Sequence, residues 1–311
     1  MMLGRRYSYL ATVFAFASVW ACSEGTPNGP DTPDVGQDAG KDSAPGERED
    51  TGNPLDPDTG SKTYNKQGSI YVNFSPAQGA LAATGFISAN FYELPASSGA
   101  PSACTVTVLG GGCQKRVCPV TGGGTGATST NVSAGTLQYA VRAISSSVPM
   151  SASKEYMLNF DTTPVPYGPG DDVSFQSTGD VAPAFDTSAH VEAQARISSP
   201  FPNADNKLEL SRIGDTTVNF AGGSGNFAIS FLFTAAAQST FVMCSAPAMA
   251  GTISIPAAAF SGLPANTEGM SAASTGSNTS DVIDDWFITA TSVTPAALSD
   301  GRAYPYSVIV K

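Results

Sequence analysis

The sequence predicts an all-β protein: a disulfide-stapled antiparallel β-sandwich, one large or two packed subdomains, after a disordered N-terminal tether. Beyond Tyr64, apolar and polar side chains alternate in short runs, the pattern of strands with one buried face. Gly, Pro, Asn or Asp bounds each run, as expected for turns between antiparallel strands. The 311 residues include 32 Gly and 22 Pro, and only 13% are charged. This composition suits many short strands better than long helices.

Residues 1–21 have the layout of a secretory signal peptide. Arg5 and Arg6 supply a positively charged start, and an almost unbroken apolar run follows from Leu10 to Ala21. That run is too short for a permanent transmembrane helix, which needs about 20 residues. We therefore expect the chain to be exported.

The end of this stretch, Val19-Trp20-Ala21-Cys22, resembles the lipobox of bacterial lipoproteins. A lipobox has a branched apolar residue at −3, a small residue at −1 and an obligatory cysteine; Trp20 departs from the usual small or apolar residue at −2. The resemblance implies that the Cys22 thiol receives a diacylglyceryl group, that cleavage precedes Cys22, and that its new amine is open to acylation. The alternative is an ordinary cleaved signal. Ser23 after the cysteine favours anchoring at the outer membrane.

The composition of the segment after Cys22 predicts a disordered linker. We therefore expect residues 22–63 to form a lipid-anchored tether. Residues 23–63 hold 10 acidic and 3 basic residues, and Val35 and Leu55 are their only sizeable apolar side chains. Such a segment cannot bury enough apolar surface to offset the entropy of ordering. An Asp-rich calcium loop at 56–60 is the competing interpretation, but the loop spacing and terminal Glu are missing.

The region 64–311 contains the strand-like runs. In the first run Ile70, Val72 and Phe74 share one face, and the later runs repeat this alternation. A helical turn is expected at 256–263, with Pro256 at its start, and the stretch 198–206 is the best candidate for a subdomain boundary. The predicted strands lie at 69–75, 85–94, 135–144, 155–161, 171–178, 226–233, 239–246, 286–293 and 304–310.

Four cysteines remain once Cys22 is assigned to lipid, and an even number in an exported chain predicts two disulfides. Three connectivities are open. A hairpin centred on Gly111 would place Cys104 opposite Cys118, which leaves Cys113 for Cys244. Zinc is the weaker alternative because the spacing shows no C-x₂-C pair.

Three stretches together resemble exported lipoproteins of myxobacteria and related predatory bacteria. They are the cysteine triplet around a glycine turn, GDDVSFQSTGDVAPAF, and FVMCSAPAMAGTISIPAAAFSGLP, and the resemblance covers most of 64–265. It implies a disulfide-stapled β-fold of unknown function, and it transfers no active residue.

Histidine chemistry has a single candidate, His190. A Ser-His-Asp triad or a Cys-His pair would have to use it. In SAHVEAQARI, however, His190, Glu192, Gln194 and Arg196 fall on one strand face, which predicts a solvated surface.

The glycine-rich stretch 121–130 lacks the Lys-Ser/Thr of a phosphate-binding loop and predicts a flexible surface loop. We predict no metal site and no cofactor.

Carboxylate chemistry has two dense spots outside the tether, Asp171-Asp172 and Asp284-Asp285. Paired carboxylates can hydrolyse glycosides without histidine, and Trp286 beside the second pair would suit sugar binding by stacking. Neighbouring strand residues point to opposite faces, so each pair offers one inward carboxylate at most. Trp286 also begins an alternating run, which favours a core position over a stacking platform.

The function that these observations favour is that of a non-enzymatic cell-envelope lipoprotein with an adhesion, recognition or structural module. Its expected partners are the lipid bilayer, through acylated Cys22, and a glycan or envelope protein. The net charge of −11 argues against nucleic acid, because phosphate contacts need Lys and Arg. The alternative is a carbohydrate-active hydrolase that uses Asp or Glu.

Overall fold

The computed structural model describes residues 64–78, 81–94, 104–119, 129–161, 164–235, 238–302, 304 and 307–311. Its regular elements are strands and two short 3₁₀ helices, η1 (Ala248–Ala250) and η2 (Ala257–Phe260). Across these ranges, no helix combines the length and hydropathy that a membrane span requires. The predicted signal peptide, Cys22 and the predicted tether lie outside the described residues, as does most of the glycine-rich stretch 121–130.

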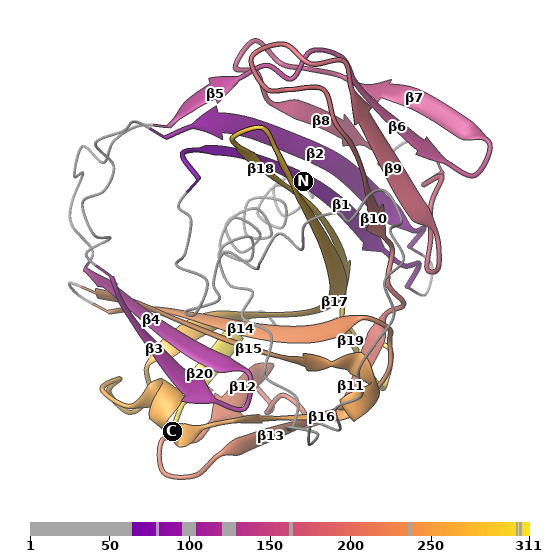
Figure 1. Ribbon diagram of the computed structural model, residues 1–311. Helices are drawn as coiled ribbons and strands as arrows, with labels where there is room; N and C mark the ends of the chain where they lie inside the picture. The colour runs from indigo at the N-terminus through magenta and orange to yellow at the C-terminus, as the bar shows by residue number, and fades with distance from the viewer. Residues whose placement is uncertain are drawn as a thin grey trace, which may run out of the picture.

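One large sheet forms the frame of the molecule and curves into an open C (Figure 1). Its main path runs β3-β4-β15-β14-β17-β18-β1-β2-β5, and β8, β12 and β20 pair beside this path. The strands are β1 (Lys66–Ser75), β2 (Thr84–Glu93), β3 (Thr105–Gly110), β4 (Cys113–Pro119), β5 (Thr130–Val132), β8 (Tyr156–Asn159), β12 (Lys207–Leu210), β14 (Asn226–Ala235), β15 (Gln238–Pro247), β17 (Glu268–Ile283), β18 (Trp286–Pro295) and β20 (Ser307–Val310).

Two smaller sheets pack on the outside of this C, one on each half (Figure 1). The first has the order β10-β9-β6-β7 and covers β1, β2 and β18. The second has the order β16-β13-β11-β19 and covers β14 and β15. Their strands are β6 (Leu137–Val141), β7 (Ile144–Val148), β9 (Asp172–Ser177), β10 (Asp186–His190), β11 (Ala195–Ser199), β13 (Thr216–Gly222), β16 (Thr252–Ile255) and β19 (Ala297–Leu298).

Each sheet-on-sheet contact encloses its own hydrophobic core. The first core contains Phe91, Phe175 and Trp286, and the second contains Phe227, Phe231 and Phe260. All six side chains are at most 2% exposed. In chain order, the first core runs to Val191 and is joined beyond that point by Trp286, Ile288 and Ala290 of β18. Apart from Cys113, the second core begins at Ala195, just ahead of the predicted boundary stretch 198–206. The fold is therefore a pair of β-sandwiches built on one shared sheet.

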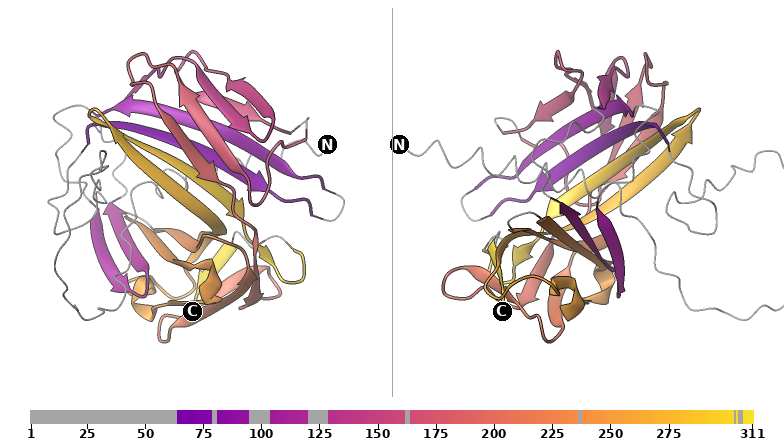
Figure 2. Two further views of the ribbon diagram at one scale, coloured as in Figure 1. Left: turned by 45° about the vertical axis from the view of Figure 1, so that its right-hand side comes forward. Right: turned by 90° about the vertical axis from the view of Figure 1, so that its left-hand side faces the viewer.

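The hairpin of β17 and β18 joins the two halves (Figure 1, Figure 2). Ala273 of β17 lies in the second core, whereas Ile288 and Ala290 of β18 lie in the first. β18 pairs parallel with β1, and β17 pairs antiparallel with β14. Three pairings, β1–β18, β11–β19 and β12–β20, are parallel, so the sheets are mixed rather than purely antiparallel.

Most predicted runs are strands in the structure, and the predicted turn at 256–263 contains η2. The run 135–144 is the exception, because the chain reverses within it at Arg142, whose φ is 54°. β6 and β7 therefore form a hairpin where one strand was expected. The run 304–310 is also shorter than predicted, since its strand, β20, begins at Ser307.

The sequence pattern missed β17, which is the longest strand at 16 residues and is rich in Ser and Thr. Hydroxyls on this hairpin donate to backbone carbonyls of the segment that links the two small sheets. Thr275 Oγ1 lies 2.7 Å from the Ala193 carbonyl oxygen, and Thr294 Oγ1 lies 2.8 Å from that of Glu192. Such hydrogen bonds allow a polar strand to be buried without unpaired groups. Periodicity of apolar residues cannot reveal a strand of this kind.

Both disulfides lie at the β3–β4 end of the large sheet. Cys104 is bonded to Cys118, and Cys113 is bonded to Cys244, which is the pairing that the Gly111-centred hairpin predicts. Cys113 and Cys244 are direct partners in the register of β4 and β15. The first disulfide therefore closes the hairpin, and the second links that hairpin to the second core.

Candidate functional site

The predicted ligand-binding residues Asp284, Asp285 and Trp286 do not form one site. Trp286 is 2% exposed and belongs to the first core. Asp284 and Asp285 occupy the exposed turn between β17 and β18, where Asp284 has a φ of 57°. Because the indole is enclosed by protein, it cannot stack on a sugar beside these carboxylates.

The Asp285 carboxylate is paired within the protein. Its Oδ2 lies 2.9 Å from Nζ of Lys66, which also lies 3.9 Å from the Glu93 carboxylate. The hydrogen bond from Lys66 holds the pKa of Asp285 below its usual value, and the same contact raises the pKa of Lys66. The general acid of a glycoside hydrolase needs a raised pKa, so the shift at Asp285 has the opposite sign.

The other acidic pair, Asp171-Asp172, is also engaged. Arg142 binds both carboxylate oxygens of Asp171, with Nε–Oδ1 2.9 Å and Nη2–Oδ2 2.6 Å. Nδ1 of His190 lies 2.7 Å from Oδ1 of Asp172, and both side chains are exposed. His190 is thus a surface histidine, as predicted.

The predicted solvated strand face around His190 is wrong for Glu192. β10 ends at His190 and β11 begins at Ala195, so the intervening residues do not continue the strand. Glu192 is only 5% exposed. Gly225 lies so close to it that a Cβ added to Gly225 would be 2.5 Å from Oε1 of Glu192. The segment turns between the two small sheets, and this turn removes the alternation that a strand would have kept.

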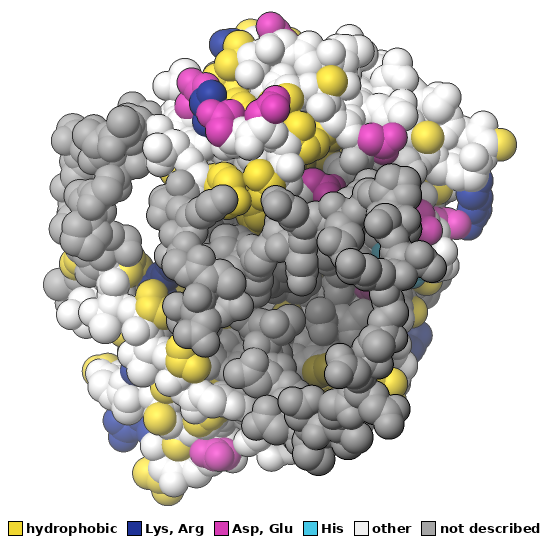
Figure 3. Space-filling view, viewed as in Figure 1, with side chains coloured by type: hydrophobic (Ala, Val, Ile, Leu, Met, Phe, Trp, Pro, Cys, Tyr) yellow, Lys and Arg dark blue, Asp and Glu magenta, His cyan; other side chains and the backbone are white. Residues whose placement is uncertain are grey.

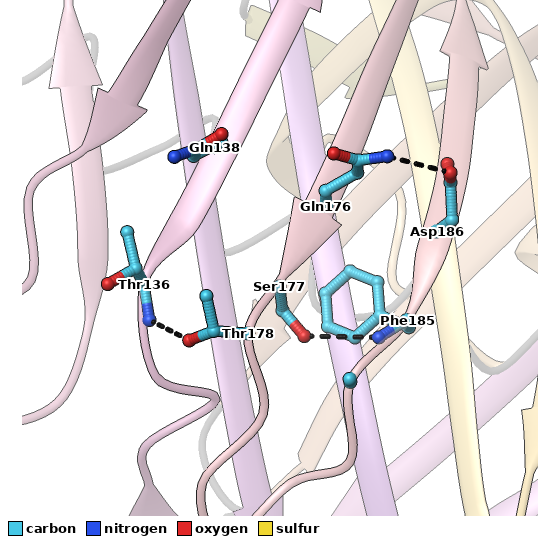
Figure 4. Close-up of a pocket in the computed structure, with 8 residues that line it drawn as sticks. Thr136, Gln138, Gln176, Ser177, Thr178, Phe185 and Asp186 are labelled. Atoms are coloured by element: carbon cyan, nitrogen blue, oxygen red, sulfur yellow. Dashed lines mark hydrogen bonds between the residues drawn. The ribbon is translucent and has the colours of Figure 1, made fainter.

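A polar hollow of about 400 Å³ is a candidate site among the described residues (Figure 4). It lies on the outer face of the β10-β9-β6-β7 sheet, opposite the face that covers the first core. Gln138, Gln176 and Asp186 form one cross-strand row, because Gln176 is the register partner of both others. The lining residues are Thr136, Gln138, Gln176, Ser177, Thr178, Ala184, Phe185 and Asp186.

Two loops form one wall of this hollow and are bonded to each other. The amide of Thr178 donates to the Thr136 carbonyl at 3.1 Å, and the amide of Thr136 donates to Thr178 Oγ1 at 2.9 Å. Ser177 Oγ donates to the Pro183 carbonyl at 3.1 Å. Gly135, at φ 76°, is required here because a Cβ would lie 2.4 Å from Thr178 Oγ1. The wall is therefore held by backbone contacts before any ligand arrives.

The hollow contains one charged group and several neutral polar groups. Gln176 Nε2 donates to Asp186 Oδ2 at 3.0 Å, which leaves Gln176 Oε1 and Asp186 Oδ1 available (Figure 4). The Gln138 amide is bonded to no side chain in the described part of the chain. Acidic and basic side chains are interspersed on the face drawn in Figure 3. In the described ranges, no three His, Cys, Asp or Glu side chains gather in a metal-binding arrangement.

Sequence reasoning did not find this hollow. Gln138, Gln176 and Asp186 lie at exposed positions of alternating strands, and such positions are usually only solvated. The row becomes visible when the register of β6, β9 and β10 is known.

No protein-family model and no curated protein matches the chain. Two solved structures align weakly, both at 9% identity and a TM-score of 0.16. One is described as "Ca2+-stabilized adhesin helps an Antarctic bacterium reach out and bind ice"; the alignment covers 80% of this chain and 66% of that one, just under two thirds. The other is described as "Structural insight into host cell surface retention of a 1.5-MDa bacterial ice-binding adhesin", with 77% and 88% covered. A TM-score of 0.16 does not establish a shared fold.

Proposed function

We propose that this chain is an exported bacterial lipoprotein, held in the outer membrane by acylated Cys22. Its double sandwich would serve a non-enzymatic role in adhesion, recognition or envelope structure. In this proposal residues 22–63 are the tether between the membrane and the folded region. The loose resemblance to exported myxobacterial lipoproteins supports the assignment to the lipoprotein class.

The main support for this proposal is that the disulfides pair every cysteine except Cys22. The chain has five cysteines, and four of them form the two disulfides, so Cys22 is the remaining one. Disulfides form and persist in oxidising compartments, which fits an exported protein. An unpaired cysteine would be a liability there, and its position at the end of an apolar leader supports a covalent use other than a disulfide.

The state of the carboxylates supports a binding or structural role over hydrolysis. Asp171, Asp172 and Asp285 each contact a basic side chain or histidine of the protein itself. Asp285 has its pKa lowered by Lys66, whereas a general acid must hold its proton near neutral pH. The hydrolase alternative therefore draws no support from the two acidic pairs that suggested it.

Replacement of Cys22 tests the anchor. We expect Cys22→Ser in the full chain to abolish the mass increase from acylation and to release the protein from the membrane fraction, because stable anchoring requires acyl chains. Ser23→Ala is the matched control and should remain acylated and membrane-bound. The measurements are intact mass and fractionation of cell envelopes. Membrane association and an unchanged mass shift in Cys22→Ser would refute the lipobox interpretation.

The recognition role has its own test. The acylated full-length protein should bind purified envelope material or glycans in a screen that compares it with a heat-unfolded sample. Cleavage of aryl glycosides by the purified protein, lost on substitution of Asp284 or Asp285, would instead support the hydrolase.

A further inference from the structure

We propose that the polar hollow on the β10-β9-β6-β7 sheet is a binding site for a neutral saccharide. This inference deepens the proposed function and rests on its recognition role. The hollow is defined by the row Gln138, Gln176 and Asp186 together with the wall hydroxyls of Thr136 and Thr178.

The spacing of the row suits a ligand that lies across the strands. Neighbouring strands are about 4.8 Å apart, so successive side chains of a cross-strand row present polar groups at that interval. Gln138 and Gln176 are register partners, and so are Gln176 and Asp186. A ligand with several polar groups along one edge could therefore contact all three side chains at once.

The hydrogen-bonding character of these groups selects a hydroxyl-rich ligand. An amide offers two donor protons and an acceptor oxygen, and a hydroxyl both donates and accepts. Thr178 Oγ1 already accepts the Thr136 amide, so its own proton can be donated to a ligand. Asp186 Oδ1 accepts only. Sugar hydroxyls, which also donate and accept, can satisfy each of these groups.

Other ligand classes fit less well. An anion would meet the Asp186 carboxylate, no lysine or arginine lines the hollow, and the net charge of the chain is −11. A divalent cation needs several carboxylates, and Asp186 is the single one in the lining. A wholly apolar ligand would leave Gln138, Gln176 and Asp186 desolvated without partners. Ala184 is exposed and gives the hollow a small apolar contact for a sugar ring, whereas Phe185 is only 6% exposed and belongs to the first core.

The size and rigidity of the hollow are consistent with a small saccharide. Its volume of about 400 Å³ lies at the lower end of the range for ligand pockets, roughly 300–1,000 Å³. The hydrogen bonds between its wall loops mean that little order has to be created on binding. Phe185 is fixed below by its ring contact with Phe91, at a centroid distance of 5.4 Å.

Saturation-transfer NMR on the full-length protein tests this site. The protein is kept in a detergent without a sugar headgroup, and the probes are glucose, galactose, mannose and N-acetylglucosamine with their β1,4-linked dimers. We expect at least one probe to bind, and both Gln176→Ala and Gln138→Ala to weaken that binding by about tenfold, because each removes a bidentate amide contact. Asp186→Asn keeps the shape and should reduce affinity without abolishing it.

The matched control is Ser147→Ala, which lies in the same cross-strand row, next to Gln138 but outside the hollow. It should leave binding unchanged, and thermal unfolding should show that every variant is folded. If no probe binds the wild-type protein, or if binding is equal in Gln138→Ala, Gln176→Ala and wild type, the inference is wrong.

Failure of this inference differs from failure of the proposed function. Binding to envelope material that persists in Gln176→Ala would refute the hollow as the site and leave the recognition role standing. Loss of acylation has its own readout in Cys22→Ser. The two proposals can therefore be rejected separately.

Discussion

Trp286 and Asp285 are neighbours in the chain but lie in opposite environments. The turn between β17 and β18 ends between them, so the indole enters the first core while the carboxylate stays exposed beside Lys66. The predicted sugar-binding motif of carboxylates beside Trp286 therefore combines two unrelated roles: the ring is part of the core, and the Asp285 carboxylate forms a surface ion pair. At the scale of single residues, burial decides which role a side chain takes.

The core position of Trp286 predicts a large effect on stability. We expect Trp286→Ala to lower the free energy of unfolding by about 3–5 kcal/mol, because it removes a large side chain that is only 2% exposed. Phe287→Ala, on the opposite face of the same strand, should cost less because Phe287 is only partly buried. Chemical denaturation measures both. A Trp286→Ala protein of wild-type stability would contradict the core assignment.

The elements of this fold depend on turns as much as on strands. The hairpin of β3 and β4 closes through three glycines with positive φ, Gly110, Gly111 and Gly112. Only one of them is also tightly packed: a Cβ on Gly112 would lie 2.1 Å from the Ser245 carbonyl oxygen, whereas Gly110 has open space. The turn thus places β4 against β15 as well as reversing the chain.

This difference can be measured with two matched substitutions. Gly110→Ala should cost about 1–2 kcal/mol of stability, since it adds left-handed strain alone. Gly112→Ala carries the same strain and also a backbone clash, so we expect a further loss of about 1–3 kcal/mol. Equal losses, measured by thermal or chemical unfolding, would show that the close contact with Ser245 does not constrain the turn.

The whole molecule is organised by contacts between residues far apart in the chain. β1 pairs with β18, and Cys113 is bonded to Cys244 across 131 residues. The β17–β18 hairpin contributes to both cores, which ties the two sandwiches together. Of these links only the Cys113–Cys244 bond persists when the chain unfolds, and it restricts the unfolded chain strongly because it closes a long loop.

The two disulfides should therefore differ in their effect on stability. Loop closure predicts a loss of about 5 kcal/mol when Cys113 and Cys244 are both replaced by Ala, and about 3 kcal/mol for Cys104 and Cys118, whose separation is 14 residues. Replacing both members of a pair leaves no free thiol. Denaturant unfolding of the two double variants makes the comparison, and the reverse order would contradict the assignment of the Cys113–Cys244 bond as the main staple.

Much of the fold was predictable because strand alternation is a local property. The runs containing Ile70 and Phe231 each alternate apolar and polar side chains within a few residues, and each is a strand. The hairpin register centred on Gly111 favoured one of three open cysteine pairings, and that pairing is the one observed. The reversal at Arg142 was missed because that residue carries no turn signature such as Gly or Asn.

Local periodicity and composition were sufficient for the all-β class and most strand positions, since each depends on residues close in sequence. The sequence left three disulfide connectivities open, and the structure decided between them. The burial of β17, the enclosed Glu192 and the row formed by Gln138, Gln176 and Asp186 depend on register and on which sheet covers which face. Hydrogen bonds to distant carbonyls, such as that from Thr275 to Ala193, make a polar strand buriable. No short window of sequence contains that information, because both partners must first be brought together by the fold.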